Sequence, residues 1–127
     1  MIQYLLIGVG GGLGAIARHL VSRASLRWFG PDQPWGTLAV NVIGGLAMGL
    51  LIGWLLSAER ADQTQIRLFA AVGFLGGFTT FSAFSLELGL MVERKLYLNA
   101  FAYGAASVIL ALGALMLGLM ITRRAFA

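Results

Sequence analysis

Residues 73–87 read Gly-Phe-Leu-Gly-Gly-Phe-Thr-Thr-Phe-Ser-Ala-Phe-Ser-Leu-Glu, and this stretch decides how the rest of the chain can fold. Two adjacent glycines followed by two threonines make a poor helix interior, because glycine costs about 1 kcal/mol relative to alanine. In lipid, a broken helix is tolerated only where its freed backbone groups are buried in protein or line a cavity. Such breaks commonly bind ions. The alternative is a packing kink stabilised by threonine hydroxyls, but the dense polar and aromatic residues after the break favour a functional site.

The composition of the chain is that of an integral membrane protein. Of its 127 residues, 59% are hydrophobic and only 11% are charged, against roughly 25% charged in soluble domains. A soluble chain of this length could not bury so much apolar surface in one core. The net charge of +4 comes from basic residues scattered at segment ends. Anionic lipid headgroups are therefore a better partner than nucleic acid.

Four apolar stretches can each cross a bilayer core of about 30 Å, which takes roughly 20 helical residues. They cover residues 2–21, 37–56, 68–92 and 96–122. A polar loop (23–35), a charged loop (59–67) and a tight turn (93–95) connect them. We expect an all-α membrane protein with a single four-helix domain over residues 1–127, in which the third helix is broken.

Basic residues are evenly divided between the two sides of such a bundle. One side holds Arg60, Arg67, Arg123 and Arg124, and the other holds Arg23, Arg27, Arg94 and Lys95, with Arg18 at the membrane edge. An excess of Lys and Arg on one side normally sets the orientation of a membrane protein. The balance is either noise in a small count or a sign of dual topology, in which copies insert both ways and pair as antiparallel dimers.

Glycines in the first two spans predict close helix packing. The first span carries Gly8, Gly10, Gly11, Gly12 and Gly14, and the second carries a doubled GxxxG pattern at Gly45, Gly49 and Gly53. Small residues at these spacings let helix backbones approach each other in membranes. Gly10, Gly12 and Ala15 also fit a loose dinucleotide-binding pattern, but no strand-turn-helix context surrounds it. With a single histidine, no cysteine and no metal-ligand spacing, the chain is not expected to be an enzyme.

The candidate site residues lie in and around the third span. Phe81 and Phe84 are three positions apart, hence on one helical face, and the positive edge of a phenylalanine ring can face an anion. The polar candidates are Thr80, Ser82 and Ser85 beside them, Asn41 in the second span, Tyr103 and Ser107 in the fourth, and the intramembrane charges Glu87 and Arg18. An aromatic pair at this spacing is otherwise usual in a core, and Arg18 can snorkel to the interface.

Three stretches resemble the signatures of the Fluc/CrcB family of fluoride channels. They are Gly-Ala-Ile-Ala-Arg at 14–18, Gly-Thr-Leu-Ala-Val-Asn at 36–41, and the whole of 76–87. The likeness covers all four spans in order, and the third stretch is highly specific. It implies an antiparallel, dual-topology homodimer in the inner membrane of a prokaryote, with two pores that conduct fluoride passively.

The resemblance also implies roles for single residues. One structural sodium ion (Na⁺) would lie at the dimer centre, held by the backbone carbonyls of Gly76 and Thr79 from each subunit. The pore would be lined by Phe81 and Phe84, with Asn41, Ser82, Tyr103 and Ser107 as polar partners, and Arg18 would lie near an aqueous vestibule. The chain departs from the family pattern at Ala83 and Ala111, where hydroxyl residues are usual, and at His19, where an aromatic is common.

Passive conduction suits the chemistry of fluoride. The ion is small and strongly hydrated, so a pore must replace its water with closely spaced donors, as carbonyl rings do for cations in other channels. The runner-up is a small dual-topology exporter of cationic drugs, a class that usually needs a carboxylate in the first span, and this first span has none. A packing subunit without a transport role would leave the polar third span unexplained.

Overall fold

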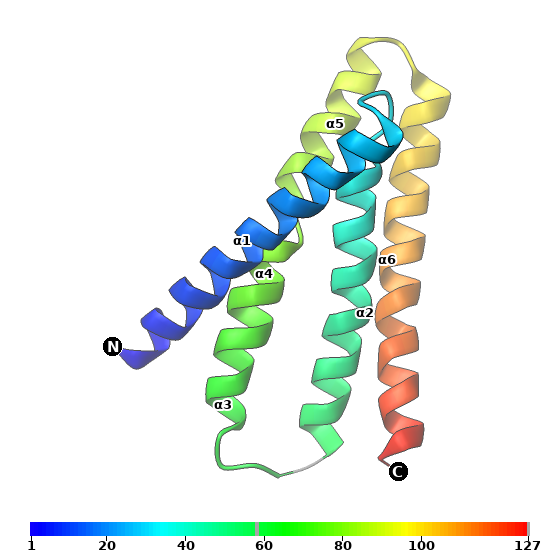
Figure 1. The fold of residues 1–127 in the computed structure, drawn as a ribbon. Coiled ribbons are helices and arrows are strands. Elements are labelled where there is room, and N and C mark those ends of the chain that lie inside the picture. The colour runs from blue at the N-terminus through cyan, green and yellow to red at the C-terminus, as the bar shows by residue number, and fades with distance from the viewer. Residues whose placement is uncertain (58, 127) are drawn as a thin grey trace.

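The computed structural model describes residues 1–57 and 59–126, and all regular structure within them is helical (Figure 1). Four segments are long and apolar enough to cross a membrane: α1 (Ile2–Phe29), α2 (Trp35–Ser57), a composite third span over Gln63–Glu93, and α6 (Tyr97–Ala125). The third span consists of α3 (Gln63–Ile66), the π-helical η1 (Arg67–Leu75), α4 (Gly76–Phe78) and α5 (Ser82–Glu93). The prediction of four spans with a broken third helix is confirmed.

The helices extend further than the apolar stretches. Helix α1 continues to Phe29, so that most of the polar loop expected from residue 23 is helical. It ends at Gly30, whose φ of 75° is favourable for glycine, and the Gly30 amide still donates to the Leu26 carbonyl at 3.0 Å. Hydrophobic length limits only the part of a helix inside the hydrocarbon. The backbone hydrogen bonds of the helix continue into the membrane–water interface until a residue such as Gly30 ends the helix.

The break in the third span follows the glycine pair instead of coinciding with it. Gly76 is still helical, with φ −62° and ψ −38°, whereas Thr79 is extended, with φ −83° and ψ 157°. The sequence did not indicate that the preceding residues 67–75 form a π-helix, a form that is rare and frequent at functional sites.

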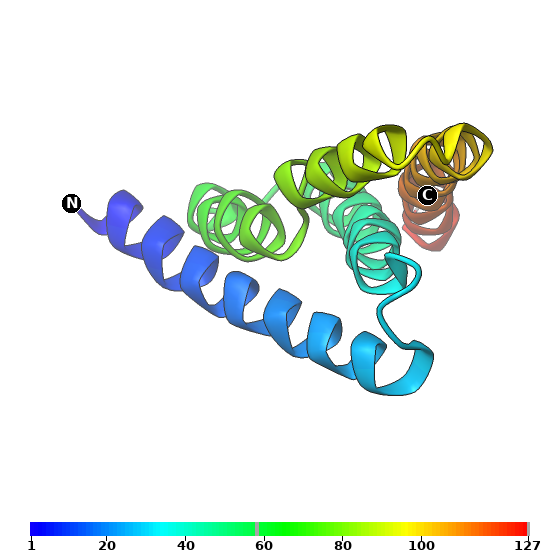
Figure 2. The same ribbon diagram turned by 90° about the horizontal axis from the view of Figure 1, so that it is seen from above.

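Helix α1 crosses the third span obliquely and packs on η1 and α4 (Figure 2). Glycine makes this approach possible. A Cβ atom at Gly10 would lie 3.0 Å from the Phe74 amide nitrogen, and one at Gly14 would lie 2.9 Å from that of Phe78. Gly11 meets Gly77 across the same contact.

Not every glycine of the first span takes part in this contact. A Cβ atom at Gly8 or Gly12 would meet no atom of another described element within 4 Å, so the expectation of one packing face holds for the other three only. The doubled GxxxG of α2 makes the close packing expected of it, and its partner is α6. A Cβ at Gly45 would lie 2.7 Å from the Ala111 carbonyl oxygen.

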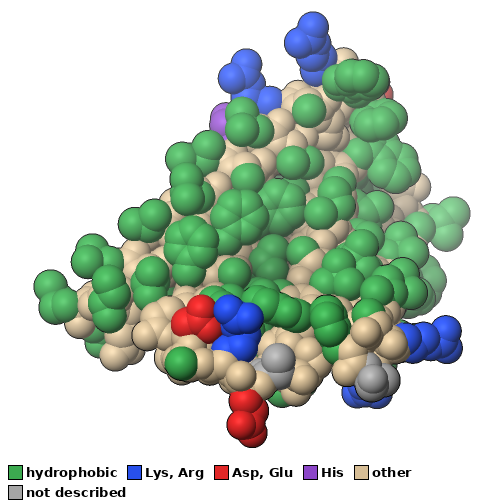
Figure 3. All heavy atoms as spheres, turned by 60° about the horizontal axis from the view of Figure 1, so that its bottom comes forward, with side chains coloured by type: hydrophobic (Ala, Val, Ile, Leu, Met, Phe, Trp, Pro, Cys, Tyr) green, Lys and Arg blue, Asp and Glu red, His purple; other side chains and the backbone are tan. Residues whose placement is uncertain are grey.

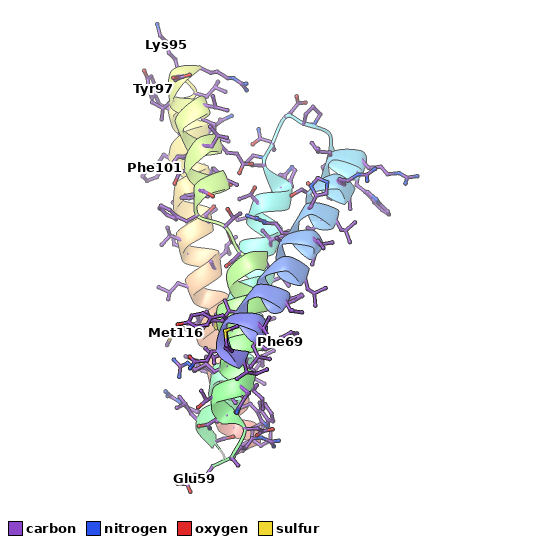
Figure 4. All side chains as sticks on the ribbon, turned by 90° about the vertical axis from the view of Figure 1, so that its left-hand side faces the viewer. Glu59, Phe69, Lys95, Tyr97, Phe101 and Met116 are labelled. Atoms are coloured by element: carbon purple, nitrogen blue, oxygen red, sulfur yellow. The ribbon has the colours of Figure 1, made fainter. Side chains whose placement is uncertain are left out.

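Apolar side chains cover the middle of the molecule, and charged side chains stand at its ends (Figure 3). Lys95 and Tyr97 mark one end and Glu59 marks the other (Figure 4). At the Glu59 end, the Arg60 guanidinium bonds the Asp62 carboxylate and holds the pKa of Asp62 below its usual range. Val40 is the one large hydrophobic side chain among the described residues that is fully buried in the protomer. An apolar exterior of this kind requires lipid or a second copy of the chain to cover it.

Candidate functional site

Asn41 of α2 holds the break in the third span. Its side-chain amide bonds both backbone groups of Thr80: Oδ1 accepts from the Thr80 N–H at 2.8 Å, and Nδ2 donates to the Thr80 carbonyl at 2.9 Å. An asparagine side chain has the same donor and acceptor pair as a peptide unit, so it satisfies a residue that lies in no helix. Asn41 therefore replaces the helical partners that Thr80 lacks.

The break leaves several backbone carbonyls without their normal helical donors, among them those of Gly76 and Thr79. The Thr80 N–H, which in a regular helix would donate to the Gly76 carbonyl, donates to Asn41 instead. The Ala83 N–H, which would donate to the Thr79 carbonyl, donates to the Thr80 hydroxyl at 3.1 Å. The Gly76 and Thr79 carbonyl oxygens are thereby available to another partner, and carbonyl oxygens are ligands for hard cations.

Thr80 also stabilises the start of α5. Its hydroxyl accepts a hydrogen bond from the amide of Ala83, the second residue of that helix, as threonine commonly does near a helix start. The same hydroxyl lies 3.3 Å from the hydroxyl of Ser82. Thr80 is buried and Ser82 is exposed in the protomer, so Ser82 presents its hydroxyl outward while Thr80 maintains the geometry of the break.

Phe81 and Phe84 lie side by side, with ring centroids 5.6 Å apart, but their environments differ. Phe84 is 8% exposed and packs against Tyr103 at 5.2 Å between ring centroids. Phe81 is 77% exposed on the surface of the protomer. The structure brings the two rings together as their spacing predicts, and it places one in the core and the other on an uncovered face.

A cavity of about 380 Å³ opens at the break. Its lining combines the candidate polar and aromatic residues of three spans, among them Asn41, Thr79, Thr80, Phe81, Phe84, Ser107 and Ala111. The Ser107 hydroxyl is buried and makes no hydrogen bond of normal geometry with the described residues, although the Tyr103 hydroxyl is within reach of it. A buried unpaired hydroxyl is costly, and this one borders a cavity where a small polar solute could accept from it.

A line of hydroxyls leads from Ser107 to a second cavity, of about 310 Å³. Tyr103 lies one helical turn before Ser107, and its hydroxyl donates to the Glu87 carboxylate at 3.5 Å. The Thr37 hydroxyl is within reach of both Tyr103 and Glu87. Thr37 and Glu87 line the second cavity together with Ser22, Ser25 and Arg94.

Thr37 was missed as a site residue in the sequence. It precedes Asn41 by four positions and so lies on the same face of α2; this spacing was the available signal. Arg18, by contrast, is not brought together with the other candidates. It lies on α1 one turn after Gly14, is partly buried, and is not among the lining residues of either cavity.

Within residues 1–57 and 59–126, no three His, Cys, Asp or Glu side chains are grouped closely enough to hold a metal ion. The chemistry available at the site consists of freed backbone carbonyls on one side and a series of hydroxyl, amide and ring-edge donors on the other.

Comparison with known proteins places these features in a family. The family model described as CrcB-like protein, Camphor Resistance (CrcB), matches residues 5–119. A protein of Phenylobacterium zucineum named "Fluoride-specific ion channel FluC" is 54% identical over the whole length of both chains. Proteins of the same name from Caulobacter sp. and Mesorhizobium japonicum are each 52% identical, over 99% and 97% of this chain and 98% of their own lengths.

Proposed function

The chain belongs to the CrcB-like protein family, and from this membership we infer that it is a fluoride-specific ion channel of the prokaryotic inner membrane. The relatives named as fluoride channels match it from end to end. The four membrane-spanning segments supply the multi-pass architecture that such a channel needs. Its task is passive conduction and not an enzymatic reaction.

The observation that carries the site assignment is the cavity at the break, which brings the buried Ser107 hydroxyl together with Asn41, Phe81 and Phe84. The Asn41 amide nitrogen has two N–H groups, and only one of them is needed for the Thr80 carbonyl. The second can donate to an anion. Ring edges of Phe81 and Phe84 carry partial positive charge, and Ser82 adds an exposed hydroxyl beside them.

The dehydrated ion would then pass along the hydroxyls of α6 and α2. Ser107, Tyr103 and Thr37 lie in succession between the two cavities. Each hydroxyl can donate one hydrogen bond to fluoride, so that water is replaced in small steps. Glu87 marks the end of this line, where the second cavity begins.

The complete channel is an antiparallel dimer with two pores. Support for the dimer comes from surfaces that one protomer leaves uncovered, since Phe81 is 77% exposed in the middle of a membrane span. The equal division of Lys and Arg between the two ends favours insertion in both orientations. Antiparallel pairing brings the two broken helices to the same depth, so each protomer contributes an equivalent pore.

A sodium ion at the dimer centre fits the freed carbonyls. The Gly76 and Thr79 oxygens of two copies give four neutral ligands. A site without carboxylates does not hold Ca²⁺ or Mg²⁺ tightly, so a monovalent cation is the better occupant. Its charge would tie the two broken helices together and add a positive field between the pores.

Export of cationic drugs by a small dual-topology transporter is the competing function. Such a protein usually needs a carboxylate in its first span, and α1 contains no acidic residue. Liposomes that contain the purified protein decide between the two. Rapid release of trapped fluoride, measured with a fluoride electrode against protein-free liposomes, is the expected result. Absence of fluoride release from folded dimers that transport a cationic dye would overturn the assignment.

A further inference from the structure

One face of α1 changes from apolar to basic along a continuous stripe. Val9, Leu13, Ile16 and Leu20 follow one another at spacings of four, three and four residues, which keeps them on one side of a helix. Their exposed fractions are 56%, 48%, 60% and 59%. No other part of the protomer covers these side chains.

Arg23 and Arg27 continue the stripe with the same spacing, three and then four residues after Leu20. Both are exposed. Arg23 comes nine positions after Gly14, which is about 180° around a helix of 3.6 residues per turn. Since Gly14 packs against the third span, the arginines point away from the bundle and not into either cavity.

The two arginines have no acidic partner in the part of the chain that the structure describes, where Arg60 and Asp62 form the single ion pair. Trp28 and Phe29, next to Arg27, are 79% and 66% exposed. Exposed tryptophan is typical of the membrane–water interface. The stripe therefore runs from the depth of acyl chains to the depth of headgroups.

We propose that the stripe from Val9 to Arg27 binds an anionic phospholipid, with an acyl chain along Leu13, Ile16 and Leu20 and the headgroup phosphate between Arg23 and Arg27. At 1.5 Å per residue, Arg23 lies about 4.5 Å beyond Leu20 along the helix, and Arg27 about 6 Å further. This separation matches the passage from the glycerol backbone to the phosphate. Binding here is separate from the fluoride pathway.

The shape and charge of the stripe select this occupant. Free phosphate would contact the arginines and leave the apolar part unused. A second copy in parallel orientation would set arginines against arginines, and an antiparallel copy would press them into apolar residues, both of which are unfavourable in lipid. An anionic lipid covers the apolar part of the stripe with an acyl chain and pairs its phosphate with the two arginines.

Trp28 can report the bound lipid. In a protein with Trp35→Phe and Trp54→Phe it becomes the single tryptophan, and lipids brominated on their acyl chains quench it on contact. The measurement compares quenching by brominated phosphatidylglycerol and brominated phosphatidylcholine, each diluted in unlabelled phosphatidylcholine. We expect phosphatidylglycerol to be enriched at Trp28. Each arginine near an anionic surface contributes roughly five-fold, so Arg23→Gln/Arg27→Gln should remove most of the enrichment.

Two matched variants complete the test. Arg23→Lys/Arg27→Lys keeps the charge and should keep the enrichment, and Arg123→Gln/Arg124→Gln removes the same charge from the other end of the chain and should leave it unchanged. Equal quenching by the two lipids, or full enrichment in Arg23→Gln/Arg27→Gln, would overturn the proposal. If the single-tryptophan protein does not fold, native mass spectrometry of the chain with all its tryptophans decides the same question by counting phosphatidylglycerol molecules retained with and without the two arginines.

Discussion

Replacement of Asn41 by alanine should disrupt the break in the third span. In Asn41→Ala, the Thr80 N–H and carbonyl lose partners at 2.8 Å and 2.9 Å. The freed Thr80 N–H can then donate to the Gly76 carbonyl four residues earlier and extend α4 towards a regular helix. That change would withdraw one of the two oxygens assigned to the central cation.

The loss of stability in Asn41→Ala can be calculated from the two lost hydrogen bonds. Side-chain hydrogen bonds between membrane helices contribute about 0.6 kcal/mol on average and about 1.7 kcal/mol at most. The pair at Asn41 therefore stabilises the protomer by about 1–3 kcal/mol. The part-buried Thr80 carbonyl accepts no other hydrogen bond from the described residues, so the expected loss lies in the upper half of this range.

The assay measures fluoride efflux per folded dimer at several sodium concentrations. If Asn41 acts by keeping the Gly76 carbonyl free, its loss weakens cation binding, and a higher sodium concentration should restore part of the flux by mass action. If Asn41 acts only as a donor to fluoride, sodium should restore nothing. We expect reduced flux in Asn41→Ala at low sodium and partial recovery at high sodium.

Asn99, the other asparagine of the chain, provides the control. It is exposed near the start of α6, at the second cavity and away from the break, so Asn99→Ala should leave both the dimer and its sodium dependence unchanged. Equal flux from Asn41→Ala and wild type at every sodium concentration would refute the role of Asn41 in the break. A uniform loss that sodium does not alter would show that its role is confined to the pore.

Three further predictions concern topology and the pore lining. Reporter tags at the C-terminus should be accessible from both sides of the membrane, and two or three added lysines at one end should bias insertion; a single orientation for every copy contradicts dual topology. Ala111→Ser should raise fluoride flux, because Ala111 lines the same cavity as Ser107, which lies one helical turn before it. Unchanged efflux would mean that the hydrogen-bond donors already present in the cavity suffice. Phe84→Ile should lower the stability of the protomer by about 1–3 kcal/mol, because it changes the shape of a core side chain, whereas Phe81→Ile should lower it by no more than about 0.5 kcal/mol, because Phe81 is exposed. Both variants should lose most fluoride efflux. Wild-type efflux from the folded dimer of either variant would show that the residue only packs.

Much of the fold is determined locally and could be read from the sequence. Apolar length alone defines four spans, because a bilayer core of fixed thickness accepts only helices of sufficient hydrophobic length. The break after Gly76 and Gly77 could be anticipated from helix propensity, since glycine and threonine weaken a helix wherever it is placed. The GxxxG pattern of α2 predicts a close helix contact, because close approach depends on residue size and spacing, but only the structure shows that the partner is α6.

The partners of individual side chains were decided only by the tertiary structure. Asn41 and Thr80 are 39 residues apart, and no local pattern shows that the amide of one replaces the helical bonds of the other. Phe81 and Phe84 are the same residue type in the same helical region, and the sequence does not distinguish them, yet the crossing of α5 and α6 buries Phe84 and leaves Phe81 exposed. Propensity and hydropathy act along the chain and can be read residue by residue, whereas hydrogen-bond partners and burial depend on how the helices cross, which is fixed by all their contacts together.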